Sequence, residues 1–246
     1  MKADPEVQRR LLDLQARDSA LARLEHRRRT LPELAVVADA DARLAALRDD
    51  VVRAETEVGD LDRELRRLED DVDQVRRRAE RDQQRMLSGA VPAKELESLQ
   101  HEVETLTRRQ SDLEDTELEV MERREDAESR AGAVRADVEK LTTTRSEAEQ
   151  ARDKAFAEID AEAATDTEVR AGLAGQLPAD LMALYEKVRA ASGGVGAAML
   201  RQRRCEGCRL ELMGAELRAA QAAPPDEVLR CENCRRILVR TPESGL

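Results

Sequence analysis

The four cysteines of this 246-residue chain form two Cys-x-x-Cys pairs near its C-terminal end. Cys205 and Cys208 make the first pair, and Cys231 and Cys234 make the second, with 22 residues between the pairs. Two such pairs can supply the four thiolates of a tetrahedral zinc site. A metal ion with four protein ligands has no open position for a catalytic water. We therefore expect one structural Zn²⁺ that folds a small ribbon and performs no chemistry.

Cys-x-x-Cys pairs can also be redox-active dithiols or disulfides. A redox motif normally sits at the start of a helix in a sheet-rich fold and occurs once. Two pairs at ribbon spacing, in a chain that we expect in the reducing cytoplasm, favour zinc. The two histidines, His26 and His101, are far from the cysteines in sequence, and we expect them on the surface.

Arginines surround the cysteines and are the second group that could bind a ligand. Guanidinium groups bind phosphates through charge-assisted hydrogen bonds, so the cluster could contact RNA or DNA. The competing interpretations are a solvated surface and compensation of an anionic metal centre. No aromatic residue lies among the arginines, so stacking on bases is not supported. The candidates for nucleic-acid or partner binding are Arg201, Arg203, Arg204, Arg209, Arg230, Arg235, Arg236 and Arg240.

The net charge of −11 is unevenly distributed along the chain. Residues 199–240 contain nine Arg and six Asp or Glu, a net of +3, and residues 241–246 add one Glu. Residues 1–198 therefore carry −13. An acidic segment of this size repels nucleic acid, which weakens the nucleic-acid interpretation.

The composition indicates long helices rather than an ordinary globular core. Charged residues make up 39% of the chain and aromatic residues only 1%, and Trp is absent. Phe156 and Tyr185 are the whole aromatic content, whereas a packed core of this size normally uses many such rings. High charge with abundant Ala, Leu, Glu and Arg is typical of coiled coils.

Apolar residues from Val51 to Ala79 recur at alternating steps of three and four, which is the pattern of a supercoiled helix pair. Asp4-Pro5 is a helix start, and Leu31-Pro32 predicts a kink. Residues 88–92 contain Gly89 and Pro92 and predict a turn. Two arms of similar length around this turn favour an antiparallel hairpin within one chain, in which Asp4 faces Ala174. Pairing between two chains is the alternative.

The second arm has a poorer apolar seam. Continuing its register places polar residues at seam positions, where they lower stability and can fix the register. Such positions could be tolerated defects or could mark a docking surface for a third helix. These residues are Gln110, Glu117, Arg124, Arg145 and Arg152.

The sequence thus predicts a mainly α fold, a long kinked antiparallel coiled-coil hairpin followed by a small C-terminal zinc ribbon. We expect the hairpin in residues 1–175, with its turn at 87–92, and a short helix plus the ribbon in residues 176–246. The ribbon region shows strand patterns at 195–200, 210–212, 228–229 and 237–239, a helix at 214–221, and a tail at 241–246 expected to fray.

Several segments resemble a known family of bacterial coiled-coil proteins with a C-terminal four-cysteine zinc ribbon, long catalogued as a domain of unknown function. The similar segments are Pro92–Gln100, Leu113–Asp115, Glu117–Glu122, Leu184–Arg189, Gly193–Val195 and Arg236–Leu238, together with the cysteines. The match spans both arms and the ribbon in family order. Two departures occur: Arg235 stands where the family has Gly, and Val239-Arg240 replace aromatic residues.

The resemblance implies a kinked hairpin and a zinc ribbon that act as an adaptor. Members of the family are associated with RNA, with alternative sigma factors and with flagellar or secretion machinery. A protein of the transcription machinery is therefore a partner that the resemblance implies, with RNA as the other ligand. We do not transfer the flagellar and secretion roles.

The predicted function is a non-enzymatic adaptor that uses the ribbon to bind a protein. The alternative is a regulator that binds RNA or DNA through the arginines. The sequence has no phosphate-binding glycine loop and no nucleophile–base pair, so we expect no enzyme and no small-molecule substrate. It shows neither a secretory signal nor an apolar run of membrane-spanning length, so we expect a cytoplasmic protein without membrane contact.

Overall fold

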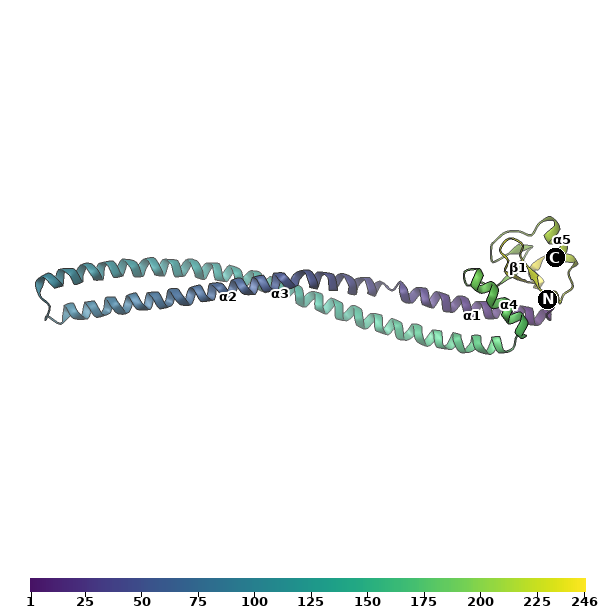
Figure 1. Cartoon of the computed structure of the whole chain (residues 1–246), viewed down its shortest axis with the longest axis horizontal. Helices are drawn as coiled ribbons and strands as arrows, with labels where there is room; N and C mark the ends of the chain where they lie inside the picture. Colours follow the sequence, from purple (N-terminus) through teal and green to yellow (C-terminus); the bar gives the residue numbers. More distant parts are fainter. The chain divides into compact units, whose positions relative to one another are not determined.

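A computed structural model describes all 246 residues, which divide into two compact units. One unit contains residues 1–34 and 149–246, and the other contains residues 35–148. Most of the chain is helical (Figure 1). The helices are α1 (Pro5–Arg29), α2 (Pro32–Leu87), α3 (Ala93–Gly175), α4 (Ala179–Ala191) and α5 (Gly214–Ala222). The ribbon contributes β1 (Ala197–Arg201), β2 (Arg204–Cys205), β3 (Leu229–Arg230), β4 (Ile237–Val239) and the 3₁₀ helix η1 (Pro242–Ser244).

The predicted helix start and kink are confirmed. The Asp4 side chain caps α1 by accepting a hydrogen bond from the Glu6 N–H at 2.8 Å, and Pro5 occupies the first turn. Helix α1 ends at Arg29 and α2 begins at Pro32, because proline has no N–H to continue the helical hydrogen bonds. No helix of the structure is both long enough and apolar enough to cross a membrane.

Residues 35–148 form the hairpin unit, in which α2 and the first part of α3 run antiparallel (Figure 1). Its seam contains Leu61, Val120 and Ala127, all buried. The predicted polar seam residues of α3 are half-buried, and Arg124 donates a hydrogen bond to Asp62 of α2. This hydrogen bond lowers the pKa of Asp62, with a further contribution from the charge of Arg124. Arg124 and Arg145 thus form ion pairs with α2, whereas Gln110 and Arg152 pair with residues of α3 itself.

The ribbon of the other unit has a four-stranded sheet in the order β2-β1-β4-β3. Strands β1 and β4 are parallel, with Ala198 opposite Leu238, and the two outer pairings are antiparallel. The predicted strand at 210–212 is only a single bridge, between Arg204 and Glu211. Two backbone hydrogen bonds hold this segment beside residues 203–205: the Cys205 N–H donates to the Leu210 carbonyl at 3.0 Å, and the Leu212 N–H donates to the Arg203 carbonyl at 2.7 Å.

An apolar core joins this sheet to the helices of its own unit. Leu11 and Leu14 of α1 pack with Tyr185 of α4 and with Ile237 and Val239 of β4. Each of these residues is fully buried. Tyr185 therefore packs α4 against both α1 and the ribbon sheet.

Buried polar groups lie beside this core and link the same elements. The Tyr185 hydroxyl donates to Asp18 Oδ2 at 2.6 Å, and Arg170 Nε donates to Asp18 Oδ1 at 2.7 Å. Gln15 Oε1 accepts the Gly196 N–H at 2.6 Å, directly before β1. Burial, followed by the hydrogen bond with Asp18, raises the pKa of Tyr185. We refer to Gln15, Asp18, Arg170 and Tyr185 as the junction network.

Two details of the predicted arms and tail were wrong. Arg10, not Asp4, lies at the end of α3, where it donates to Gln176 at 3.1 Å. The C-terminal tail is not frayed, because Ser244 is buried and its hydroxyl donates to the Leu200 carbonyl at 2.9 Å. The Gln202 N–H also donates to the Glu243 carbonyl at 2.8 Å. Backbone hydrogen bonds to the β1–β2 turn therefore order the tail.

Replacing two glycines by alanine should change stability in opposite directions. A Cβ on Gly196 would lie 2.7 Å from the Tyr185 ring and 2.8 Å from the Tyr185 carbonyl, so Gly196→Ala should destabilise its unit by about 1–3 kcal/mol. A Cβ on Gly132, inside α3, would meet nothing within 4 Å, so Gly132→Ala should stabilise the helix by up to about 1 kcal/mol.

Chemical denaturation can measure both effects. Fluorescence of Tyr185, the only tyrosine, follows the first unit, and circular dichroism follows the helices. Equal effects of the two substitutions would contradict the close packing at Gly196.

Candidate metal centre and surrounding arginines

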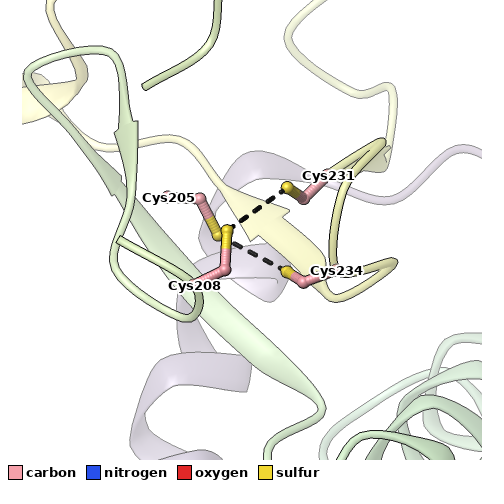
Figure 2. A group of neighbouring side chains, drawn as sticks. All are labelled: Cys205, Cys208, Cys231 and Cys234. Atoms are coloured by element: carbon pink, nitrogen blue, oxygen red, sulfur yellow. Dashed lines mark hydrogen bonds between the residues drawn. The ribbon is translucent and has the colours of Figure 1, made fainter. Parts of the chain in front are cut away.

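The four cysteine side chains converge at one point of the ribbon (Figure 2). All four Sγ atoms lie within 4.8 Å of one another. The Sγ atoms of Cys205 and Cys234 are 3.8 Å apart, as are those of Cys208 and Cys231. The two Cys-x-x-Cys pairs therefore face each other, one from each half of the ribbon.

This arrangement fits a tetrathiolate zinc centre. With Zn–S bonds of about 2.3 Å, the edges of a tetrahedron of sulfurs are about 3.8 Å long. The two shortest separations agree with this value. The four-cysteine cluster therefore has the donor set and the spacing for one structural zinc ion.

The electrostatics of the thiols also call for a cation. Burial raises the pKa of Cys205 and Cys231, and neighbouring cysteines add to the effect. Desolvation acts on Cys208 as well, but hydrogen bonds, including one from the Leu210 N–H, outweigh it and lower the pKa of Cys208 to about 7. Four adjacent thiolates repel one another, and a bound divalent cation removes this repulsion.

The two knuckles share one backbone geometry. The N–H that follows each second cysteine donates to the carbonyl of the first: Arg209 to Cys205 at 2.6 Å and Arg235 to Cys231 at 2.9 Å. Both Arg209 and Arg235 have φ of +64°, in the left-handed region that favours glycine. This backbone conformation explains why the resembled family has glycine at the position of Arg235. In this chain an arginine adopts the same conformation, which is strained for a residue with a side chain.

Two of the candidate arginines are structural. Arg236 donates to the carbonyls of Ser192 at 2.8 Å and Gly207 at 3.2 Å, which connects the end of α4 to the first knuckle. Arg240 donates to four carbonyls in residues 223–227, at distances from 2.6 to 3.1 Å. Their guanidinium groups are already occupied by the ribbon's own backbone.

The other six candidates are exposed, and they differ in their partners. Arg201 pairs with Glu243 at 3.0 Å, Arg203 donates to the Gly245 carbonyl, and Arg230 donates to the Arg235 carbonyl. The side chains of Arg204 and Arg209 have no ion pair or hydrogen bond, and neither has that of Arg235. Ligand binding by any of these arginines stays a prediction.

Sequence reasoning missed the junction network, which fixes the base on which the ribbon sits. One signal was available. The steps from Leu11 and Leu14 to Leu21 place Asp18 at a seam position of α1, where a carboxylate needs partners. The partners Arg170 and Tyr185 are more than 150 residues away, so the sequence did not identify them.

Comparisons with known proteins agree with this architecture and with one structural zinc ion. Residues 14–193 match the CT398-like coiled coil hairpin domain, and residues 204–238, which contain all four cysteines, match a C4-type zinc ribbon domain. An uncharacterized protein of Mycobacterium tuberculosis is 40% identical over 240 residues, covering 98% of both chains. An uncharacterized protein of Mycobacterium leprae is 33% identical over 228 residues, covering 93% of this chain and 94% of its own.

Solved structures show the same fold. A protein from Mycobacterium smegmatis is similar with a TM-score of 0.82 and 39% identity, covering 98% of this chain and all of its own. CT398 from Chlamydia trachomatis has a TM-score of 0.63 at 17% identity, covering 96% of this chain and 98% of its own. At this identity the likeness concerns the fold alone.

Removal of the metal should unfold the ribbon and leave the helices. The ribbon strands span only two to five residues each, so the metal supplies much of the energy that folds them. A strong chelator should expose residues 197–240 to protease, while the helical circular dichroism signal is retained. Elemental analysis should find one zinc per chain, and Cys208→Ser should mimic chelation. A ribbon that resists protease after complete metal removal would refute the prediction.

Arg235→Gly should stabilise the ribbon. Left-handed backbone costs a non-glycine residue about 1–2 kcal/mol, and the greater freedom of glycine in the unfolded chain cancels about half of this gain. The expected net gain is about 0.5–1 kcal/mol, seen as slower zinc loss to a chromogenic chelator. Arg230→Gly, in β3 with ordinary backbone geometry, is the control and should accelerate the loss. Similar effects of both variants would argue against strain at Arg235.

Proposed function

Because this chain belongs to the family of CT398-like coiled-coil hairpin proteins with a C4-type zinc ribbon, we propose that it is a non-enzymatic adaptor whose ribbon binds a protein partner. A coiled-coil domain joined to a zinc ribbon supports a structural or binding role. In the proposal, the zinc ion and the junction network hold the ribbon in one conformation, and the ribbon surface makes the contact. A reducing compartment such as the cytoplasm suits the thiolates.

One observation carries the proposal, the exposure of large apolar side chains beside the first knuckle. Leu210 is 52% exposed and Met213 is 69% exposed. In a small ribbon, large apolar side chains left in water lose the free energy that their burial would contribute, so their exposure indicates a contact surface. Met and Leu side chains adapt well to apolar partner surfaces. Zinc closed by four thiolates offers no position for substrate, which favours binding over catalysis.

The partner class is the part of the proposal that rests on resemblance. A protein of the transcription machinery is the partner that the resembled family implies. An apolar contact around Leu210 and Met213 would be insensitive to salt, because burial of apolar surface depends little on ionic strength.

RNA or DNA binding is the second candidate. It is supported by the exposed side chains of Arg204 and Arg209, which have no ion pair. The occupation of Arg236 and Arg240 by backbone carbonyls weakens it. A contact of this type would fall steeply as salt increases, because phosphate binding releases counterions.

An affinity purification of the full chain from its native host distinguishes the two candidates. We expect one protein to be retained after ribonuclease treatment and at high salt, and to be lost after chelation. Leu210→Asp with Met213→Asp should reduce its recovery at least about tenfold, while Arg204→Glu with Arg209→Glu should leave it unchanged. Zinc content and circular dichroism control for folding of both variants.

The opposite pattern would refute the adaptor proposal. Recovery of transcripts that are lost in the arginine variant, and at high salt, would select nucleic-acid binding instead. Recovery of neither protein nor nucleic acid would reject both candidates.

A further inference from the structure

The hairpin unit exposes two large apolar side chains that do not pack in its seam. Leu118 and Met121 of α3 are 59% and 41% exposed. Their neighbours Leu113, Val120 and Ala127 are buried, and Val120 and Ala127 pack in the seam with α2. Residues three apart on a helix lie on the same face, so Leu118 and Met121 form one apolar patch directed away from the seam.

Carboxylates flank this patch on the same face of α3. Glu114, Asp115, Glu122 and Glu125 lie three, four or seven residues from Leu118, and all four are exposed. We call these four residues, with Leu118 and Met121, the outer face of α3. None of its carboxylates forms an ion pair, although Glu114 accepts a hydrogen bond from Gln110.

The basic residues of segment 111–136 all interact with the other helix. The segment 111–136 contains four basic residues, all of them arginines. Each pairs with a carboxylate of α2: Arg123 with Glu64, Arg124 with Asp62, Arg130 with Glu57 and Arg135 with Glu55. The four arginines thus pair with carboxylates of α2, and the carboxylates of the outer face of α3 have no ion pair.

The helix surface beyond the patch is smooth. Ser129, Gly132 and Ala133 continue the same face and are exposed, and a Cβ on Gly132 would meet no atom within 4 Å. Small side chains allow another helix to approach closely, because interaxial distance depends on the side chains at the contact. The surface therefore suits an elongated partner element better than a compact ligand.

We propose that the outer face of α3 is a docking site for a basic amphipathic helix of a partner protein. Apolar side chains of that helix cover Leu118 and Met121, and its Lys or Arg residues pair with the four carboxylates. Charge complementarity selects this occupant, since the face has four negative charges and no positive one. The same charge repels nucleic acid and anionic membrane surfaces. This surface lies in the hairpin unit, so the proposal does not depend on what the ribbon binds.

Photocrosslinking in the native host tests the proposal with the full chain. A benzophenone amino acid replaces Leu118 in one variant and Val52 of α2 in a control variant, because Val52 is also exposed and apolar in the hairpin unit. Mass spectrometry then identifies the crosslinked peptide. We expect Leu118 to crosslink to a segment of another protein that carries several Lys or Arg residues and helical apolar periodicity, and Val52 to give no such product.

Charge reversal provides the second readout. Adding Glu122→Lys and Glu125→Lys to the Leu118 crosslinking variant should reduce the yield about tenfold, because it replaces attraction by repulsion at two contacts. These side chains are exposed, so helical circular dichroism and zinc content should not change. Ribbon variants at Leu210 and Met213 should leave the Leu118 crosslink intact, which separates this proposal from the function of the ribbon.

Three results of the crosslinking experiment would overturn the proposal. They are a Leu118 crosslink to a second copy of this chain, a crosslink to a segment without basic residues, and a yield no higher than that of the Val52 control. A yield that does not respond to charge reversal would also reject it.

Discussion

The structure of the unit that contains the ribbon (residues 1–34 and 149–246) depends on a buried carboxylate, that of Asp18. A carboxylate removed from water is costly unless charged or hydrogen-bonding partners surround it. Here the partners are Arg170 of α3, Arg189 of α4 and the Tyr185 hydroxyl. Apolar packing alone is non-directional and would allow these helices to slide. The demand of one carboxylate for partners from two other helices specifies how α1, α3 and α4 meet.

The same constraint continues into the ribbon through Gln15. Its side-chain oxygen accepts the Gly196 N–H, which sets where β1 begins, and its side-chain amide donates to the Gly194 carbonyl at 3.1 Å. At the other end of the ribbon the four cysteines fix the two knuckles to each other. Arg236 links the two ends, because it contacts both the end of α4 and the first knuckle. The metal and the junction network therefore act on one connected scaffold.

Much of this fold could be read from the sequence, because its signals are local. Two Cys-x-x-Cys pairs, a heptad pattern and a proline at a helix start each involve residues close together in the chain. The order of the C-terminal tail could not be read, because it depends on Ser244 meeting Leu200 across the ribbon. Likewise, nothing local distinguishes Arg236, which binds backbone carbonyls, from the exposed Arg204.

The distribution of unpaired groups then separates scaffold from contact surface. Only two buried side-chain oxygens, of Glu33 and Asp82, lack a hydrogen-bond partner, and neither residue belongs to the ribbon. Every buried polar side-chain atom of the ribbon thus has a hydrogen-bond partner. The apolar side chains without packing partners lie at the surface, at Leu210 and Met213 on the ribbon and at Leu118 and Met121 on α3, where carboxylates surround them. In the two proposals above the ribbon contact is apolar, whereas the contact on α3 also needs basic residues from its partner. Because these contacts differ in kind, the two surfaces suit two different partners, which is consistent with the adaptor that we propose.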